Sequence, residues 1–395
     1  MRKIPKLLDM IGQLIATPSV SCVNPALDQG NRDVIELLAR WLEKSGFNIE
    51  IMDTDQSNKA NLIATLGSGP GGLVLAGHTD TVPYDEGKWR HNPFKLAEAD
   101  GRLYGLGTSD MKAFLALAIE AALSFDPKDI KQPLIILATA DEETSMCGAK
   151  ALVATGRPKA RYAVIGEPTD MKPIRMHKGM MMESVRLIGR SGHSSDPSLG
   201  VNALEAMHLA MGELLSWREE LQSRYRNPLF AVPVTTLNLG HIHGGDNPNR
   251  ICGECELHID IRPLPGLTLE ELRAEMENRL QQILKSSGVR METHSLFEGI
   301  PAVETPAASP IVTAAEQLTG HHAGSVAFAT EAPYLTQLGI DTVVLGPGSI
   351  KQAHQPDEYL EIANIAPTVE LLKSLIGRFC LSPGQTLNDR QTAEP

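Results

Sequence analysis

The sequence predicts an α/β protein in which a mostly parallel central sheet is interrupted by an inserted ferredoxin-like α+β domain. Short apolar runs alternate with helical stretches in the N-terminal part, and this pattern resumes near the C-terminus. Such alternation is typical of a parallel sheet with helices on its faces. The segment between these parts has a different pattern. We therefore expect a main domain over residues 1–179 and 289–380, an inserted domain over 180–288, and a polar tail over 381–395.

The N-terminal segment is predicted to be an amphipathic helix and not a signal peptide. Apolar residues recur at helical spacing from Ile4 to Ile15, and Asp9 and Gln13 interrupt the apolar stretch. No apolar run in the sequence approaches the ~18–20 residues that a membrane span needs. We expect a cytoplasmic protein.

The remaining main-domain elements follow from short apolar runs and longer periodic stretches. The runs that predict strands are 61–66, 72–77, 133–139, 162–166 and 341–346. The stretches that predict helices are 111–123, 147–154, 310–318 and 362–379. Because ligands bind at the carboxyl ends of strands in open α/β sheets, the residues after each run are the ones to inspect.

The inserted domain is predicted from the order of its elements. Alternating segments predict strands at 181–189, 233–242 and 254–263, with a further strand near 289–296. Long amphipathic segments predict helices at 202–221 and 267–287. This β-α-β-β-α order is that of a ferredoxin-like sandwich.

Charge and cysteine content narrow the class of protein. The chain has 395 residues and a formal net charge of −12, which argues against nucleic acid or an anionic membrane surface as a partner. The five cysteines are an odd number and do not suggest a disulfide framework. Cys252 and Cys255 form a CxxC within an alternating strand, where residues three apart face opposite sides. We expect no metal or redox function for this pair.

A histidine or a carboxylate follows each of five short runs, at 72–77, 102–107, 133–139, 162–166 and 341–346. These residues are His78, Asp80, Asp110, Asp141, Glu142, Glu143, Glu167 and His354. Any one of them alone is explained by a helix cap or a solvated loop, but the fold brings these strand ends to one edge. Histidines and carboxylates without cysteine suit zinc, or cobalt or manganese in its place. More than four ligands suggests two metals that share a bridging carboxylate, with His78 as a ligand and Asp80 as its partner.

Five segments resemble the metal-site motifs of a known family. GHTDTVP, GLGTSDMK, TADEETSMCGAK, GEP and AHQPDEYL occur in the order found in the co-catalytic zinc amidohydrolases and peptidases. The resemblance extends to about residue 380, inserted domain included. It implies a zinc-peptidase-like catalytic domain and an inserted dimerisation (lid) domain. It also implies two Zn²⁺ per chain, with Co²⁺ as a substitute, a homodimer, and a small N-acyl amino acid as substrate.

The resemblance assigns each motif residue a role. His78 and Glu167 would hold one zinc. Glu143 and His354 would hold the other, with Asp110 as the bridge.

Two further motif residues would act beside the metals. Asp80 would orient His78, as carboxylates commonly orient metal-bound histidines. Glu142 would be the general base that takes a proton from the bridging water and carries it to the leaving amine.

The inserted domain would contribute substrate contacts. Segment 188–197 resembles the one in which a histidine, here His193, reaches across a dimer to stabilise the oxyanion. Asn249 matches a residue near that oxyanion, and Lys178 and Arg262 match positions that grip the substrate α-carboxylate. Without the resemblance, we would interpret His193 as an ordinary loop histidine and Arg262 as a solvated charged residue on a strand.

The segment 325–360, with Thr330 as a substrate-binding residue, is most similar to the acetylornithine deacetylases of this family. The resemblance implies hydrolysis of N-acetylornithine to ornithine and acetate in arginine biosynthesis. The alternatives are a succinyl-diaminopimelate desuccinylase, another N-acyl amino acid deacylase, or a dipeptidase. A catalytically inactive binding protein is least favoured, because Glu142 and every ligand are present.

His241 and His243 form an HxH motif that a strand would place on one face. They belong to no complete ligand set in the sequence, so we expect ordinary strand residues.

Overall fold

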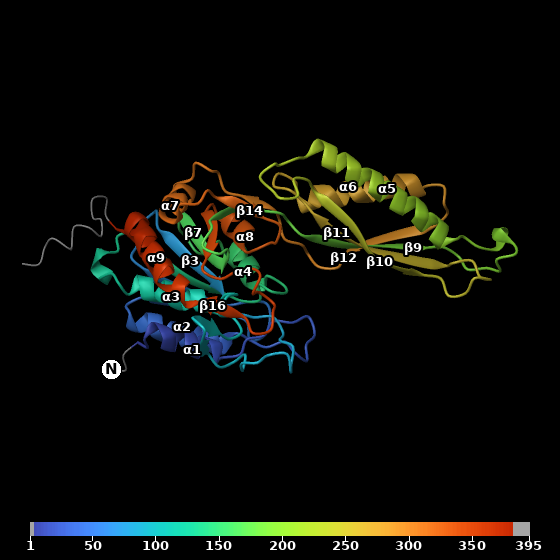
Figure 1. Cartoon of the computed structure of the whole chain (residues 1–395). Helices are drawn as coiled ribbons and strands as arrows, with labels where there is room; N and C mark the ends of the chain where they lie inside the picture. Colours follow the sequence, from blue (N-terminus) through green and yellow to red (C-terminus); the bar gives the residue numbers. More distant parts are fainter. Residues whose placement is uncertain (1–3, 382–395) are drawn as a thin grey trace, which may run out of the picture. The chain divides into compact units, whose positions relative to one another are not determined.

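The chain divides into two units in the computed structural model, which describes residues 4–381 (Figure 1). Unit 1 comprises the chain up to Arg175, Thr305–Gly324 and the segment from Thr330 onward. Unit 2 comprises Met176–Glu304 and Ser325–Ala329. The predicted polar tail lies outside the described residues, apart from its first residue.

The inserted unit is longer than the predicted range 180–288. Strand β12 (Arg290–Ser295) pairs with β9 (Met181–Ile188), and β13 (Val303–Glu304) pairs with β8 (Ile174–His177). The segment that directly follows residue 288 therefore completes the sheet of unit 2. The boundary placed at 288 differs from the end of this segment of unit 2 at Glu304, and the further strand predicted near 289–296 belongs to unit 2.

The central sheet of unit 1 runs in the order β1-β2-β6-β3-β7-β15, after which β8 follows. Its strands are β1 (Asn48–Asp53), β2 (Ala60–Leu66), β3 (Leu73–His78), β6 (Leu134–Thr139), β7 (Tyr162–Pro168) and β15 (Asp341–Gly346). The four strands β6, β3, β7 and β15 are parallel neighbours, whereas β1–β2 and β2–β6 are antiparallel. The predicted mostly parallel sheet is confirmed. A small sheet joins β4 (Ala97–Ala99), β5 (Arg102–Tyr104) and β16 (Tyr359–Glu361).

Helix α3 (Lys112–Ala122) fixes the centre of unit 1. All of its residues except Glu120 are buried, because it packs on β3 and also contacts α1 (Leu7–Ile15) and α9 (Ile365–Cys380). The other helices of this unit are α2 (Arg32–Lys44), α4 (Cys147–Thr155), α7 (Pro310–Thr319) and α8 (Ala332–Gln337). A helix apolar on all sides requires such a buried position.

Unit 2 has the predicted ferredoxin-like order β9-α5-β10-β11-α6-β12. Its sheet is antiparallel throughout, in the spatial order β10-β11-β9-β12. The remaining elements are α5 (Ala203–Arg224), β10 (Thr236–Gly244), β11 (Glu254–Arg262) and α6 (Leu269–Leu284). Both helices lie on one face of the sheet (Figure 1). Burial alternates along β11 accordingly, so that one face is apolar and the other polar.

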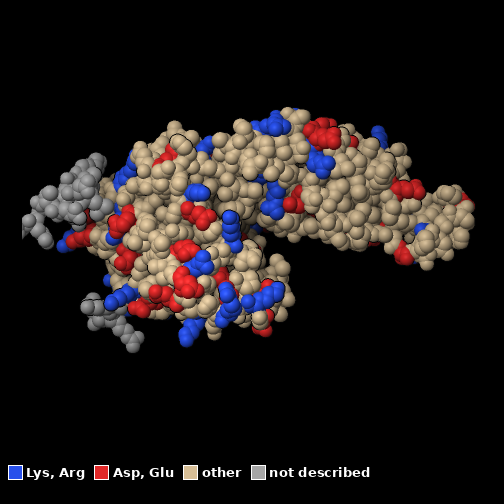
Figure 2. Space-filling view, viewed as in Figure 1, with Lys and Arg blue, Asp and Glu red and all other residues tan. Residues whose placement is uncertain are grey.

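Two surface properties complete the description. None of the helices formed by residues 4–381 is long and apolar enough to cross a lipid bilayer. On the face shown in Figure 2, basic side chains are interspersed with acidic ones over unit 1.

Candidate metal centre

The sheet of unit 1 brings the predicted strand ends together. His78 is the last residue of β3 and lies opposite Thr139, the last residue of β6, in the parallel ladder. Glu167 lies near the end of β7, the other parallel neighbour of β3. Parallel strands end at the same edge, so all three residues lie at the carboxyl edge of the sheet.

Five predicted ligands form two overlapping clusters. The ligand atoms of His78, Asp110 and Glu167 lie within 4.8 Å of one another, and so do those of Asp110, Glu143 and His354. Asp110 belongs to both clusters. Its Oδ1 lies 3.1 Å from His78 Nε2, and its Oδ2 lies 3.5 Å from His354 Nε2. One carboxylate thus faces two histidines with different oxygens, as a bridge between two metals requires.

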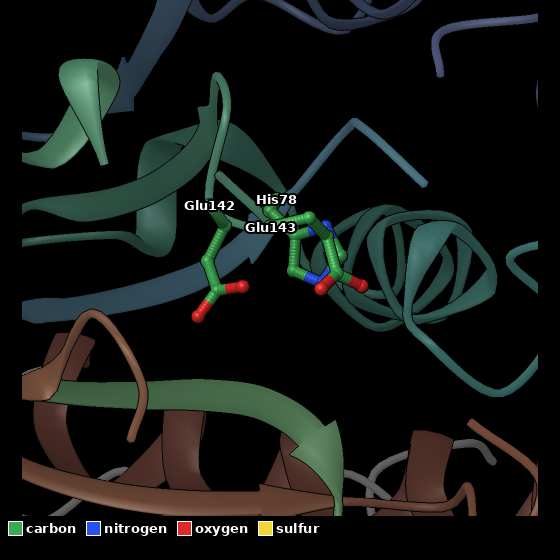
Figure 3. A group of neighbouring side chains, drawn as sticks. All are labelled: His78, Glu142 and Glu143. Atoms are coloured by element: carbon green, nitrogen blue, oxygen red, sulfur yellow. The ribbon is translucent and has the colours of Figure 1, made fainter. Parts of the chain in front are cut away.

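His78 and His354 each present Nε2 to the clusters. His78 Nδ1 donates to the backbone carbonyl of Asp80 over 2.9 Å, which leaves Nε2 as the nitrogen that can bind a metal. His354 Nε2 lies 3.0 Å from Glu143 Oε1. Figure 3 shows the Glu143 carboxylate beside the His78 ring, whereas the Glu142 side chain extends separately.

The carboxylate of Asp80 has a second set of partners. Its Oδ1 is 3.6 Å from His78 Nδ1, beyond a normal hydrogen bond. Its two oxygens instead accept hydrogen bonds from the backbone N–H groups of Glu142, at 3.2 Å, and Glu143, at 3.1 Å. Asp80 therefore orients the loop that carries both glutamates, and orients His78 mainly through its carbonyl.

A buried ion pair stabilises the start of the loop that carries Glu142 and Glu143. Asp141 has a left-handed backbone with φ of 63° and forms an ion pair with Lys59, which also contacts Asp28 at 2.9 Å. Ser21 Oγ donates to Asp141 Oδ1 over 2.6 Å. These contacts fix the backbone that leads into Glu142.

The electrostatics of the centre call for cations. Burial and repulsion from Glu167 raise the pKa of the Glu142 carboxyl well above its ordinary value. Burial also raises the pKa of Glu143 and, strongly, that of Glu167. Among the described residues, Glu167 Oε1 is buried without a hydrogen-bond partner. Crowded, buried carboxylates beside imidazole nitrogens fit a pair of borderline divalent cations, which would neutralise this charge.

Comparison with known proteins identifies the family. The peptidase family M20/M25/M40 matches residues 74–378. The chain belongs to this family. The acetylornithine deacetylase of Proteus mirabilis is 50% identical over 381 residues, which is 96% of this chain and 98% of that protein. The acetylornithine deacetylase of Pasteurella multocida is also 50% identical, over 96% of this chain and 100% of that protein.

Solved structures of the M20 family share the fold at lower identity. The aminopeptidase PepT of Bacillus cereus aligns with a TM-score of 0.74 and 21% identity, over 93% of this chain and 96% of that one. A dinuclear metal-binding M20 peptidase of Bacillus subtilis aligns with a TM-score of 0.66 and 16% identity, over 94% of this chain and 97% of that one. The expected family and fold are confirmed, and the chain is a metal-dependent amidohydrolase.

In this M20 enzyme, four of the predicted substrate-contact residues lie in unit 2, as do their own contacts. Ser194 N, next to His193, donates to the Asn249 carbonyl over 3.1 Å, so the loops of His193 and Asn249 are neighbours. Arg262 Nε lies 3.0 Å from both carboxylate oxygens of Asp260. Lys178 is buried, and this burial lowers its pKa.

Thr330, the remaining predicted substrate-binding residue, lies outside unit 2. It is buried in unit 1, and its hydroxyl accepts a hydrogen bond from the Ala332 backbone N–H over 3.1 Å. The hydroxyl therefore helps to start α8. Its neighbour Glu331 accepts a hydrogen bond from Thr139 Oγ1 over 2.8 Å, and burial raises the pKa of Glu331 to about 7.

Glu358 positions the loop of Asp110 in this centre, and it was not among the predicted site residues. Its Oε1 accepts hydrogen bonds from the backbone N–H groups of Ser109, at 2.6 Å, and Asp110, at 2.9 Å. Its Oε2 accepts one from Gly107 over 3.0 Å. Glu358 thus holds the loop that presents Asp110. Its place four residues after His354 was the one available signal, but no local pattern indicates which amides a carboxylate will meet.

Proposed function

We propose that this enzyme hydrolyses N-acetylornithine to ornithine and acetate, a step of arginine biosynthesis. The observation that carries the proposal is the 50% identity, over nearly the full length, to proteins named acetylornithine deacetylase. The two clusters around Asp110 support a hydrolytic centre of this kind. A cytoplasmic location is part of the proposal and agrees with the free state of the five cysteines.

The proposed cofactor is a pair of Zn²⁺ ions per chain, with Co²⁺ as a substitute. His78 and Glu167 would hold one ion, Glu143 and His354 the other, and Asp110 would bridge them. Such a pair supplies an acidified water and polarises the amide carbonyl of the substrate.

Glu142 is the proposed general base. Its carboxyl group belongs to a cluster with His78 and Glu143 but is not needed in either set of ligands around Asp110. A Glu142 carboxylate oxygen accepts a proton from the attacking water, and the hydroxide oxygen bonds to the amide carbon. The same Glu142 oxygen then gives the proton to the amide nitrogen as the C–N bond breaks, which releases the free α-amine and acetic acid. The acetic acid loses its remaining proton to solvent and leaves as acetate.

Residues of unit 2 are proposed to bind the rest of the substrate. Lys178 and Arg262 would bind the α-carboxylate, and His193 and Asn249 would contact the developing oxyanion. His193 Nδ1 accepts from the Ser195 N–H over 3.2 Å, so the ring proton can sit on Nε2 and be donated. The proposal includes a homodimer formed through unit 2, in which His193 of one chain serves the centre of the other.

A substrate panel tests the proposal. Zinc-loaded protein is assayed against N-acetylornithine, N-acetylmethionine, N-succinyl-diaminopimelate and several dipeptides. We expect the highest kcat/KM for N-acetylornithine. Preference for the succinylated substrate would indicate a desuccinylase, and preference for a free α-amine would indicate a dipeptidase. Either result would refute the proposed substrate.

A further inference from the structure

The face of the unit 2 sheet that lies opposite α5 and α6 carries a group of three histidines and one glutamate. His241 pairs with His258, and His243 pairs with Glu256, in the register of β10 and β11. Residues two apart on a strand share a face, and so do cross-strand partners. These four side chains, which we call the histidine cluster, therefore project from one face. The alternate residue Leu257 is buried in the core of unit 2.

The spacing of the rings approaches that of a metal site. The ring centre of His241 lies 5.3 Å from the ring centre of His243 and 5.1 Å from that of His258. Two imidazoles bound to one tetrahedral zinc, with Zn–N near 2.0–2.1 Å, have ring centres about 5 Å apart. The third pair, His243 and His258, is wider at 6.3 Å. The groups of three ligand atoms within 4.8 Å of one another that the described residues form do not include this cluster, so metal binding requires its side chains to rotate. The His243 side chain is 56% exposed and has room for such a rotation.

Glu256 is placed to supply the fourth ligand. Its Oε1 lies 3.0 Å from His258 Nε2, and its Oε2 lies 3.8 Å from His243 Nε2. Ser184 Oγ donates to Glu256 Oε1 over 2.6 Å. Hydrogen bonds of this kind orient metal-binding carboxylates. The nearby cation Arg186 is engaged by Glu254, at 2.7 Å, so its charge is balanced.

Solvent and ions have access to the cluster. A hollow of about 530 Å³ is lined in part by His243 and Glu256. Imidazole and carboxylate ligands without cysteine suit a borderline divalent ion such as zinc. All four residues belong to unit 2, so they share no ligand with the centre around Asp110.

We propose that His241, His243, His258 and Glu256 bind one divalent transition-metal ion, with Zn²⁺ as the ion to test first. This metal is additional to those of the catalytic centre. It would link the edge strand β10 to β11 at the register shift between Leu239 and His241. The expectation that the HxH motif consists of ordinary strand residues is thereby revised, because β11 supplies the partners that the motif lacked.

Metal content measures the site directly. The full-length protein is stripped with a chelator, dialysed against excess Zn²⁺ and then against buffer, and analysed for zinc per chain. We expect the wild type to retain one more equivalent than His241→Ala/His258→Ala. The matched control is His321→Ala/His322→Ala, which removes two exposed histidines of unit 1 and should keep the wild-type content. The kcat for the preferred substrate should be the same in all three proteins.

A second variant covers the case in which the double variant fails to fold. Glu256→Gln keeps the size of the side chain but weakens the ligand, and should raise the Kd for the additional zinc at least about tenfold in a competition titration with a chromophoric chelator. Equal zinc content in the wild type and the folded double variant would refute the proposal, as would an unchanged Kd in Glu256→Gln.

Discussion

At the residue scale, one aspartate positions two adjacent glutamates for which we propose different roles. The Asp80 carboxylate accepts the backbone N–H groups of both Glu142 and Glu143, which fixes the direction in which each side chain leaves the loop. Glu143 then meets His354, whereas Glu142 remains outside that pair. In the proposed mechanism, position in the loop, and not residue type, separates the metal ligand from the proton carrier.

Substitutions at the two glutamates should therefore have different effects. Glu142→Ala should keep the metal content and lower kcat by about 10²–10⁴-fold, because the proton carrier is lost. Glu143→Ala should lower the affinity of one metal. Metal analysis and steady-state kinetics on both variants test this, and metal loss in Glu142→Ala alone would reverse the assignment.

Glu358 should act on the metals without touching them. In Glu358→Gln one of the two acceptor oxygens becomes an NH₂ group that faces a backbone N–H, so the loop that presents Asp110 loses an anchor. We expect metal affinity to fall about 10–100-fold, as when other residues that orient ligands are replaced. Glu361→Gln is the control, since Glu361 pairs with Arg102 at the surface. Equal affinities in the two variants would contradict this role.

One buried histidine contributes to the pH dependence of stability. Burial lowers the pKa of His177 to about 4 from 6.5. Below about pH 6.5 the unfolded chain therefore binds a proton at this histidine, whereas the folded protein binds it only near pH 4. The free energy of unfolding falls as the pH drops from about 6.5 to 4. The difference between a pKa of 6.5 and a pKa of about 4 corresponds to ~3 kcal/mol.

His177→Asn should flatten this pH dependence. The measurement is the free energy of unfolding by urea at several values between about pH 7 and pH 4. The exposed His322, replaced in the same way, should leave the wild-type slope unchanged. Identical slopes in the His177 variant and the wild type would show that His177 takes up its proton in the folded state.

At the element scale, helix α6 shows how a local signal can be sufficient. Thr268 and Glu271 form a capping box, in which each side chain bonds the other's backbone N–H. Thr268→Ala should lower the free energy of unfolding by about 1 kcal/mol, because a capping acceptor is lost. Denaturant unfolding measures this, with Thr313→Ala, at a half-buried position inside α7, as a comparison. A loss equal to that of the control would mean that the cap contributes nothing.

Features that depend on a local sequence pattern could be predicted from the sequence. Contacts between residues far apart in the sequence could not. His78 and Glu167 stand at the ends of strongly apolar strands, so their place at the sheet edge follows from the sequence. The contacts of Glu358 join residues about 250 positions apart, and no periodicity records them. The histidine cluster likewise depends on a register shift between Leu239 and His241, which decides that His241 faces His258.

At the scale of the whole molecule, the residues proposed for catalysis are divided between the units. The metal ligands and Glu142 belong to unit 1, whereas His193 belongs to unit 2. If His193 acts on the centre of the other chain of a dimer, one centre with Glu142 intact is active as long as the other chain supplies His193.

Mixed dimers test this division. His193→Ala alone should lower kcat by about 10²–10³-fold with unchanged metal content, since an oxyanion donor is lost. Heterodimers of the His193→Ala and Glu142→Ala chains contain one centre with Glu142 intact and His193 supplied by the other chain. They should regain activity that both parent homodimers lack. If re-equilibrated mixtures remain inactive, His193 does not act between chains.

The point at which unit 2 joins unit 1 bears on how such a protein could arise. Val303 pairs with His177, and the Thr305 backbone N–H donates to the Arg175 carbonyl over 2.8 Å. The chain therefore leaves unit 1 and returns to it on neighbouring strands, about 4.8 Å apart. An ancestor with a short hairpin at this place could have accepted residues 176–304 as one graft, with every proposed metal ligand already encoded on either side. The two parts of the protein could then have diversified under separate selection.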